Sequence, residues 1–322
     1  MTKAIVTGGA GFIGSYIVEE LLSRNYDVVV IDNMSSGRRE NLKNVIDNPK
    51  LEIIEADLKE MKTYWTRVFS DADIVFHYAA NPEVKVSSIN PRIHFNENLL
   101  ATFNVLEAAR QGSVKYIVFA STSTVYGEAK KLPTPENYYP LEPISVYGSV
   151  KLASEYLHIT YSKLYGIKSL IVRYANVIGP RSKHGVIYDF ILKLKKNPRE
   201  LEILGDGTQR KSYIYVTDAV KATFSVLNEF ISSKREYDIY NVGNSDWITV
   251  KEIADIVVEE MNLSNVRYIY KPMTSDGRGW PGDVKIMLLD ISKAMSTGWK
   301  PQFSSKDAVR LTVRALIREL SE

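Results

Sequence analysis

Hydrophobic positions up to about residue 175 follow two alternating patterns along the chain. Short runs rich in β-branched residues are apolar on both faces, and between them lie longer segments whose apolar positions recur at helical spacing. Strands that are buried on both faces are typical of a parallel sheet with helices on either side. The pattern therefore predicts an α/β fold with a doubly wound parallel sheet. The expected strands are 3–7, 27–32, 51–56, 73–80, 115–121 and 168–176, and the expected helices are 12–24, 39–47, 60–69, 91–110 and 147–165.

After this region the alternation becomes less regular, and shorter elements of both kinds are mixed. A strand and a helix within 212–227 and a strand at 237–243 should rejoin the first sheet. We therefore expect a main domain made of 1–175 plus about 212–242, and a smaller α/β lobe made of about 176–211 plus 243–322. The further elements expected are helices at 186–196, 249–262 and 305–320 and an apolar run at 266–272.

The composition excludes several classes of function. With 322 residues, 45% of them hydrophobic, the chain can build a substantial core, and the lack of cysteine excludes disulfides, thiol catalysis and thiolate metal sites. The four histidines are widely separated in the sequence, so we expect no bound metal. The net charge of +3 forms no basic stripe, and no apolar run reaches the roughly 20 residues of a membrane helix, so we expect neither nucleic-acid binding nor membrane insertion. Since the chain starts without a signal-peptide pattern, we expect a cytoplasmic protein.

A glycine-rich turn stands between the first expected strand and the first expected helix. In TGGAGFIG, residues Gly8, Gly11 and Gly14 follow the spacing G-x-x-G-x-x-G, one residue longer at the front than the usual dinucleotide fingerprint. Gly8 permits the tight turn, Gly11 lets backbone N–H groups approach a pyrophosphate, and Gly14 lets the helix pack closely on the strand. The start of the helix then faces the anion. The loop therefore indicates a Rossmann-type dinucleotide site.

An acidic residue at the end of the second expected strand bears on the choice of cofactor. Asp32 lies where a carboxylate can bind the adenosine ribose hydroxyls and repel a 2′-phosphate, which favours NAD over NADP. In the alternative, Arg38 and Arg39 hold a 2′-phosphate and the cofactor is NADP. Asp57, after the third strand, is expected beside the adenine or, in the alternative, at the start of a helix.

Two Tyr-x-x-x-Lys matches occur in the chain, and their surroundings differ. Tyr126 and Lys130 run into a segment with four prolines within thirteen residues, which predicts a loop without a fixed relation between the two side chains. Tyr147 and Lys151 lie in a segment that keeps helical periodicity, so they share one face of a helix. An adjacent ammonium and a cationic nicotinamide both favour the Tyr147 phenolate, which makes this pair the candidate acid–base catalyst of an oxidoreductase.

Further short motifs stand in order along nearly the whole chain. They are HYAA at 77–80, the asparagine and threonine of NENLLATFNVLEAA, STSTVYG and RYANVIGPR. Together with the glycine loop and the Tyr147–Lys151 pair, they resemble the motifs of the extended short-chain dehydrogenase/reductases. Within that family the chain is most similar to the UDP-glucose (UDP-galactose) 4-epimerases.

The resemblance implies roles for individual residues. The catalytic tyrosine and lysine of the family fall on Tyr147 and Lys151, and its catalytic serine or threonine falls on Thr122, whose hydroxyl would help to pass a proton between the sugar O4 and Tyr147. The implied NAD contacts are Gly8, Gly11, Phe12, Ile13, Gly14, Asp32, Asn33, Ser36, Gly37, Asp57, Leu58, Ala79, Ala80, Asn98, Tyr147 and Lys151. The implied substrate contacts are Thr122, Asn176, Val186, Arg210, Lys211, Arg278 and Asp283.

Three departures from the family pattern concern the substrate side. Lys211 stands where the family has the arginine that grips the diphosphate, and Arg210 lies one residue earlier. Trp280 replaces the arginine of the family's Arg-Pro-Gly-Asp, with Arg278 two residues upstream, and Pro82 replaces a lysine that some epimerases carry. Because a lysine cannot offer the two-pronged hydrogen bond of a guanidinium, we expect a diphosphate grip rearranged around Arg210 and Arg278.

The activity implied by the resemblance is that of an NAD-dependent nucleotide-sugar 4-epimerase, which interconverts UDP-glucose and UDP-galactose through a bound 4-keto intermediate. Ser123 and Thr124 replace the Asp-Glu pair of family members that dehydrate sugars. The alternatives are another extended-family enzyme (4,6-dehydratase, decarboxylase or reductase) and a non-catalytic NAD-sensing regulator. Met287, at the family position that controls pocket depth, leaves the acceptance of N-acetylated sugars open. The resemblance also implies a homodimer joined through helices 91–110 and 147–165, with NAD in the main domain and the nucleotide sugar in the smaller lobe.

Overall fold

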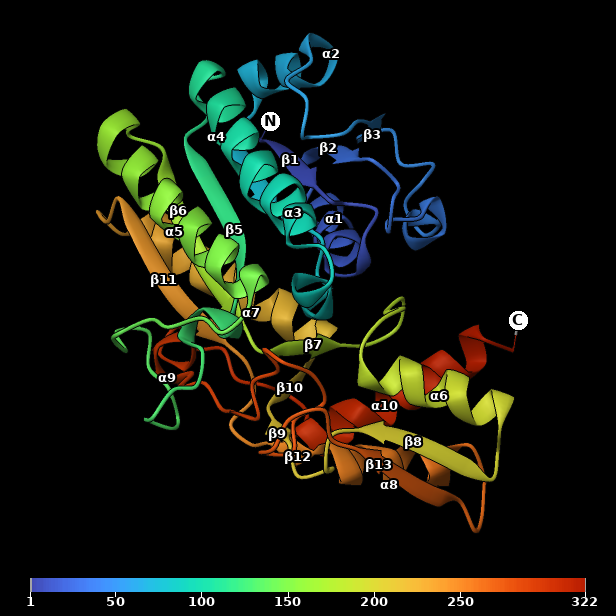
Figure 1. Cartoon of the computed structure of the whole chain (residues 1–322). Coiled ribbons are helices and arrows are strands. Elements are labelled where there is room, and N and C mark those ends of the chain that lie inside the picture. Colours follow the sequence, from blue (N-terminus) through green and yellow to red (C-terminus); the bar gives the residue numbers. More distant parts are fainter. Residues whose placement is uncertain (1, 322) are drawn as a thin grey trace.

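The computed structural model describes residues 2–321 and has a sheet of seven parallel strands at its centre (Figure 1). The order β11-β6-β5-β4-β1-β2-β3 changes direction between β1 and β4, as in a doubly wound sheet. The predicted Rossmann-type α/β fold is therefore confirmed. The strands are β1 (Lys3–Thr7), β2 (Asp27–Asp32), β3 (Leu51–Glu55), β4 (Ile74–His77), β5 (Tyr116–Thr122), β6 (Lys168–Tyr174) and β11 (Tyr237–Val242).

Helices cover both faces of this sheet and create two separate cores. Val6 and Val30 face α1 and α7, whereas Ile5 and Ile31, their neighbours along the strands, face α4 and the segments around it. This alternation of two buried faces explains why the strands are apolar throughout. The helices are α1 (Phe12–Ser23) and α7 (Val216–Ser232) on one face, and α4 (Ala101–Gln111) and α5 (Val146–Tyr165) on the other (Figure 1).

Three predicted helices are shorter or less regular than expected. Only a 3-10 turn, η1 (Arg39–Leu42), forms within 39–47, where asparagine and aspartate favour turns over helix. The segment 60–69 contains α2 (Thr63–Thr66) followed by η2 (Arg67–Asp71). The segment 91–110 is divided into α3 (Pro91–His94), a π-helical turn η4 (Phe95–Leu100), and α4. Two further 3-10 turns are η3 (Val84–Ser88) and η5 (Ser123–Tyr126).

The second half of the chain forms a core of its own beside the sheet (Figure 1). Three helices pack there against a parallel pair of strands; these are α6 (Val186–Lys196), α8 (Val250–Glu260), α10 (Ser305–Glu319), β8 (Glu200–Leu204) and β13 (Arg267–Lys271). Further short elements are β9 (Arg210–Lys211), β12 (Ile248–Thr249), β14 (Ile286–Met287) and α9 (Ser292–Met295). The proposed residue boundaries of the two domains stay a prediction.

One strand joins a different sheet from the one expected. β10 (Tyr213–Tyr215) pairs with β7 (Asn176–Ile178) instead of rejoining the seven-stranded sheet. The reason is the path of the chain after β6, which leaves the main sheet at Ala175 and offers β7 as a new partner. The helix and the strand that follow, α7 and β11, do return to the main sheet as predicted.

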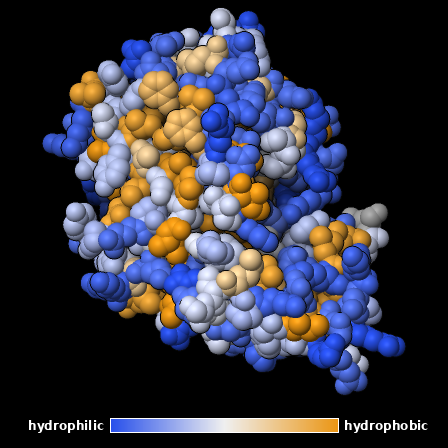
Figure 2. Space-filling model, in the orientation of Figure 1, coloured by the Kyte–Doolittle hydropathy of each residue, from blue (hydrophilic) through white to orange (hydrophobic). Residues whose placement is uncertain are grey.

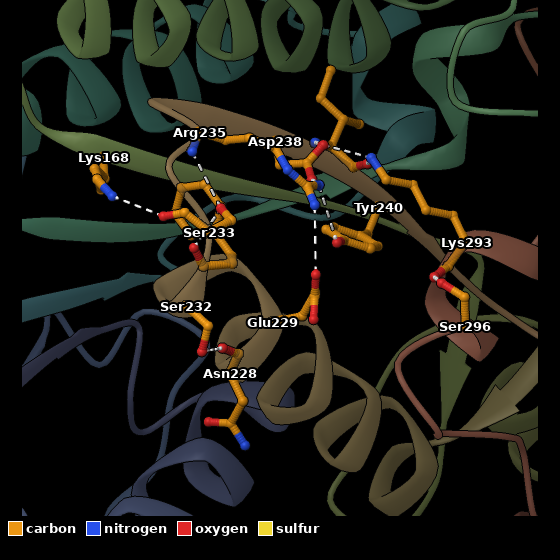
Figure 3. Close-up of polar contacts among 12 residues, drawn as sticks. Lys168, Asn228, Glu229, Ser232, Ser233, Arg235, Asp238, Tyr240, Lys293 and Ser296 are labelled. Atoms are coloured by element: carbon orange, nitrogen blue, oxygen red, sulfur yellow. Dashed lines mark hydrogen bonds and ion pairs between the residues drawn. The ribbon is translucent and has the colours of Figure 1, made fainter.

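The outer edge of the main sheet at β11 is covered by charged side chains (Figure 3). Asp238, which is 8% exposed, pairs with both Arg235 and Lys293. Lys293 Nζ also donates to the Ile239 carbonyl at 2.7 Å and lies 4.3 Å from the centre of the Tyr240 ring. A lysine placed over an edge strand protects its free backbone groups from pairing with another chain.

Candidate active site

A cavity of about 1060 Å³ runs along the carboxyl ends of the strands and into the second half of the chain. It passes the ends of β1 and β4, where the order of the sheet changes direction and where doubly wound folds bind their ligands. Most of the predicted site residues line it. The four that do not are Gly37, Asn98, Arg210 and Arg278.

The glycine loop at one end of the cavity leaves no room for side chains. Gly8 has φ +69°, and a Cβ there would lie 2.6 Å from the Ala79 nitrogen. A Cβ on Gly14 would lie 2.1 Å from the Gly8 carbonyl oxygen. Helix α1 starts after Gly11, and no side chain of residues 2–321 caps that start. Free backbone N–H groups at a close-packed helix start form a suitable site for a pyrophosphate.

Asp32 stands next to this loop with its carboxylate fixed by the backbone. Its two oxygens accept hydrogen bonds from the N–H groups of Ala10, at 3.0 Å, and Met34, at 2.9 Å. Burial raises the pKa of Asp32, and these two hydrogen bonds lower it. A Cβ on Gly37 would lie 2.7 Å from either carboxylate oxygen, so Gly37 contributes by its small size.

Arg38, Arg39 and Asp57, the other residues considered for the adenosine end, differ in their position relative to the cavity. Arg38 lines the cavity, whereas Arg39 lies 4.0 Å from the Glu55 carboxylate on the surface. Asp57 also lines the cavity, and its Oδ1 accepts the Lys59 N–H at 2.9 Å within a turn that starts no helix. The alternative in which Asp57 begins a helix is therefore wrong.

Asn98 does not line the cavity itself but binds the backbone of Asn81, which does. It lies in the π-helical turn η4, and its side chain accepts the Asn81 N–H at 2.7 Å and donates to the Asn81 carbonyl at 3.1 Å. The same amide lies 3.2 Å from His94 Nδ1, and the His94 ring packs edge-on against Tyr147 with 5.5 Å between ring centres. The π-turn thus connects the loop after β4 with the candidate catalytic tyrosine, and such turns are frequent at functional sites.

Tyr147 and Lys151 lie in the first turns of α5, as predicted. Ser145 caps this helix through a hydrogen bond from the Gly148 N–H at 3.1 Å, and the left-handed Gly166 ends it. Thr122 ends β5 and, like Tyr147 and Lys151, lines the cavity. One helix start and one strand end therefore bring the three predicted catalytic residues together.

Burial changes the pKa values of Tyr147 and Lys151 in opposite directions. Burial raises the pKa of Tyr147 to about 12, while its hydrogen bond with Thr122 acts in the opposite direction. Burial also lowers the pKa of Lys151 to about 8, against the influence of the Glu155 carboxylate. Lys151 Nζ donates to the Ala120 carbonyl at 2.9 Å. In the chain itself, burial therefore favours the neutral phenol, and the predicted effect of a cationic nicotinamide on Tyr147 stays a prediction.

A buried ion pair below the cavity supports this group and was not found from the sequence. The Arg173 and Glu155 side chains are 3% and 2% exposed and lie 2.6 Å apart. Ser121 donates to Glu155 at 2.5 Å, and Arg173 donates to the Tyr126 hydroxyl at 2.9 Å. Tyr126, from the rejected Tyr-x-x-x-Lys match, therefore belongs to the buried framework. Glu155 follows Lys151 by one helical turn, which was the available signal.

The substrate-side residues surround the far end of the cavity. Lys211 Nζ lies 2.6 Å from Asp283 Oδ1, and the Asp283 side chain is 4% exposed. Asn176 donates to the Ser212 carbonyl at 3.0 Å, and Val186 begins α6, which no side chain of the described residues 2–321 caps. Met287 also lines the cavity, as its predicted role in pocket depth requires.

The two arginines expected to grip the diphosphate point elsewhere. The Arg210 guanidinium packs 4.2 Å from the Trp247 ring centre. Arg278 is paired with Glu128 at 2.6 Å and donates to the Asp283 carbonyl at 2.9 Å. Neither lines the cavity, so the predicted rearrangement around Arg210 and Arg278 is not what the structure contains.

Other cations at the cavity were missed. Arg181 lines it from the end of RYANVIGPR and donates to Glu19 at 2.6 Å and to Ser15 at 3.0 Å, both on α1. Lys183, another cation, and His184, whose pKa is lowered by burial, follow in the same loop and line the cavity as well. The motif was recognised from the sequence, but a charged residue in a loop carries no signal of the direction in which it points.

Known proteins are similar to this chain in sequence and in fold. The model of the NAD dependent epimerase/dehydratase family matches residues 4–243. The chain is 38% identical over 314 residues to a putative UDP-glucose 4-epimerase of Methanocaldococcus jannaschii, with 96% of each chain covered. A solved structure of a UDP-galactose 4-epimerase is 48% identical with a TM-score of 0.86, covering 99% of this chain and 100% of its own. A UDP-glucuronic acid decarboxylase of Arabidopsis thaliana is 31% identical over 317 residues, 95% of this chain and 68% of its own.

The cofactor and the family follow from these similarities. Solved structures of relatives contain NAD, and the close-packed glycine loop with its uncapped helix start fits a dinucleotide. NAD is therefore the cofactor, as predicted, and the NADP alternative is wrong. No helix within residues 2–321 is both long and apolar enough to cross a membrane. The chain belongs to the NAD-dependent epimerase/dehydratase family of nucleotide-sugar enzymes, within the extended short-chain dehydrogenase/reductases.

Proposed function

We propose that this chain is a 4-epimerase that interconverts UDP-glucose and UDP-galactose. The observation that carries the proposal is the presence of Tyr147, Lys151 and Thr122 in one cavity with the glycine loop. Ser123 and Thr124 stand where sugar dehydratases have an Asp-Glu pair, which argues against the loss of water. Similarity to proteins named UDP-glucose and UDP-galactose 4-epimerase supports the choice of sugar.

The proposed proton path uses three side chains. Tyr147, as phenolate, takes the proton of the sugar 4-hydroxyl, and Thr122 holds that hydroxyl and the phenol in line. Bound NAD would accept a hydride from C4 and return it on the opposite face, and its cationic ring would favour the phenolate. Lys151 donates one of its three N–H groups to the Ala120 carbonyl at 2.9 Å. The other two N–H groups can then donate to the nicotinamide ribose and to the phenolate.

The diphosphate of the substrate would be held in the second half of the chain. Lys211 supplies a cation at the cavity, and the start of α6 at Val186 supplies free backbone N–H groups. Asn176 and Asp283 fix the surrounding walls through their hydrogen bonds to the Ser212 carbonyl and to Lys211. This anchor keeps the 4-keto sugar in the site while it turns over and exposes its other face.

The proposed assembly is a homodimer joined through α4 and α5. Large hydrophobic side chains are exposed along these helices: Phe103 is 42%, Tyr156 is 56% and Leu164 is 66% exposed. Figure 2 shows hydrophobic residues gathered on the face over this region. A patch of this kind is typical of an interaction surface and supports the proposed interface. A sedimentation mass of one chain at micromolar concentration would contradict the dimer.

The cytoplasmic location stays a prediction.

The test of the proposed activity is the conversion of UDP-galactose into UDP-glucose without added reductant. Tyr147→Phe removes the base but keeps the ring, so turnover should fall by roughly a hundred- to ten-thousand-fold with substrate binding retained. Lys151→Met should also abolish most turnover, whereas Lys130→Ala, from the rejected match, should change nothing. Formation of a 4-keto-6-deoxy sugar, or of UDP-xylose from UDP-glucuronic acid as the main activity, would identify a dehydratase or a decarboxylase instead.

A further inference from the structure

Three hydroxyl groups form a hydrogen-bonded row beside the cavity that the proposed mechanism does not use. Tyr78 Oη lies 2.6 Å from Tyr174 Oη, which lies 2.5 Å from Thr223 Oγ1. Tyr78 and Tyr174 line the cavity, while Thr223 is fully buried in α7. The two rings pack in the core of α1 and α7, on the opposite face of the sheet from α5 with Tyr147 and Lys151.

The direction of the hydrogen bonds in this row is inferred from the contact of Thr223 with the Ala219 carbonyl. Thr223 donates its only proton to the Ala219 carbonyl, 2.8 Å away, and can therefore only accept from Tyr174. Tyr174 has then used its own proton and can only accept from Tyr78. Burial raises the pKa of Tyr174 to about 12 and that of Tyr78 well above the ordinary range, so both phenols keep their protons. The Tyr78 oxygen at the end of the row thus offers lone pairs and no proton.

The row ends close to the reaction centre. Tyr174 is the register partner of Thr122 in the pairing of β5 with β6, and Tyr78 directly follows β4 on the other side of β5. In the proposed mechanism the nicotinamide ring would lie at this end, because its C4 would exchange hydride with the carbon whose hydroxyl Thr122 and Tyr147 would contact. The carboxamide is the part of that ring with N–H groups to donate.

We propose that the Tyr78 oxygen accepts a hydrogen bond from the carboxamide N–H of bound NAD, and that Tyr174 and Thr223 keep this oxygen an acceptor. Tyr78 is then a positioning residue that holds the nicotinamide in one rotation about its glycosidic bond. The inference depends on NAD as cofactor and not on the identity of the sugar.

A competition between two nucleotides tests the proposal without any turnover. The full chain, freed of bound nucleotide, is equilibrated with equal amounts of NAD and its 3-acetylpyridine analogue, whose methyl ketone has no N–H. Acid extraction and chromatography then give the ratio of the two nucleotides bound. Tyr78→Phe should lower the preference for NAD about fivefold relative to the unmodified protein, the effect of one neutral hydrogen bond.

Substitutions at Thr223, away from the cavity, test the direction of the row. In Thr223→Val, Tyr174 loses its acceptor and donates to Tyr78 instead, so the Tyr78 proton turns to the cavity and the preference for NAD should fall at least as far. Thr223→Ser keeps the hydroxyl and should keep the preference. As a control, Tyr161→Phe removes a phenol that donates to Glu107 at 2.6 Å away from the cavity, and should leave the ratio unchanged.

These outcomes test the proposed role of Tyr78 independently of the proposed epimerase activity. An unchanged ratio in Tyr78→Phe overturns it, and so does equal behaviour of Thr223→Val and Thr223→Ser if Tyr78→Phe does not fold. Because the readout is nucleotide binding, either result stands whether or not UDP-galactose is converted.

Discussion

The two ends of the cavity are built from different parts of the chain. At the glycine loop the cavity faces backbone N–H groups, and a Cβ on Gly14 would lie only 2.1 Å from the Gly8 carbonyl oxygen. At the far end it faces charged side chains that already have partners, such as Lys211 with Asp283 at 2.6 Å. The glycine loop can hold a ligand because missing side chains leave room beside its backbone. The far end can hold a ligand through the charged side chains that it contains.

This difference teaches where the site can change and where it cannot. At the glycine loop no side chain can be added as a new binding group, because any added atom would meet backbone that cannot move away. A site of paired side chains can change one pair at a time. In this chain Arg210 packs on Trp247 and Arg278 pairs with Glu128, and neither lines the cavity. We therefore expect substitutions at the two ends to differ in kind as well as in size.

Gly14→Ala should have the largest effect on ligand binding, because the new Cβ forces α1 away from the glycine loop. We expect NAD binding to weaken by about a hundredfold or more, equivalent to about 3 kcal/mol. Acid extraction of the purified protein measures the nucleotide bound per chain. Gly298→Ala is the matched control, since it has φ +88° but its Cβ would meet open space. It should lose about 1 kcal/mol of stability and keep its NAD. A Gly14→Ala protein with a full complement of NAD would remove the distinction between the two ends.

Lys211→Met should have the next largest effect, with two separable parts. Asp283 is left buried without its cation, which should lower the free energy of unfolding by about 3–5 kcal/mol. Loss of the cation should also raise KM for UDP-galactose about tenfold. Urea unfolding and initial-rate kinetics measure the two parts.

The double variant Lys211→Met with Asp283→Asn should regain most of the stability while KM stays high. Recovery of both together would mean that Lys211 only balances Asp283. Arg210→Ala serves as the control at the same strand, because its guanidinium packs on Trp247 outside the cavity lining, and KM should change less than twofold.

Lys151 also lines the cavity, and its effect on stability should appear only in the pH dependence. Burial lowers its pKa from 10.5 to about 8, so between these values the unfolded chain binds more protons than the folded protein. The free energy of unfolding must then rise with pH across this window. Relative to Lys151→Met, the unmodified protein should gain about 3 kcal/mol between pH 7.5 and 10.5. Urea unfolding at several pH values checks this, and parallel curves for the two proteins would show that the lysine is not buried as described.

The regular half of the fold could be predicted because its signals are local. The predicted helices 147–165 and 186–196 agree with α5 (Val146–Tyr165) and α6 (Val186–Lys196). The serine before α5 and the glycine after it mark the ends, and the apolar strands require cover on both faces. The three-residue strand β10 carried no such signal, because only the path of the chain around it determined which partner was free.

The candidate site divides in the same way. Helical spacing predicted that Tyr147 and Lys151 share a face, and this relation lies within one element. The Arg173–Glu155 pair joins two elements, α5 and β6, and the row from Tyr78 to Thr223 joins three segments that are distant in sequence. Hydrogen-bond partners of this kind depend on tertiary packing, which residue types and spacing do not describe.

The π-helical turn at Phe95–Leu100 has a consequence for how this chain can vary in length. Such a turn contains one residue more than a regular helix would need, so deleting a residue there would leave a better helix. The deletion would also rotate α3 by about 100° relative to α4 and carry His94 away from the Tyr147 ring, now 5.5 Å distant. A shorter and more stable helix is therefore compatible with the fold but not with the active site. Single-residue deletions in this helix should cause loss of activity while the fold persists.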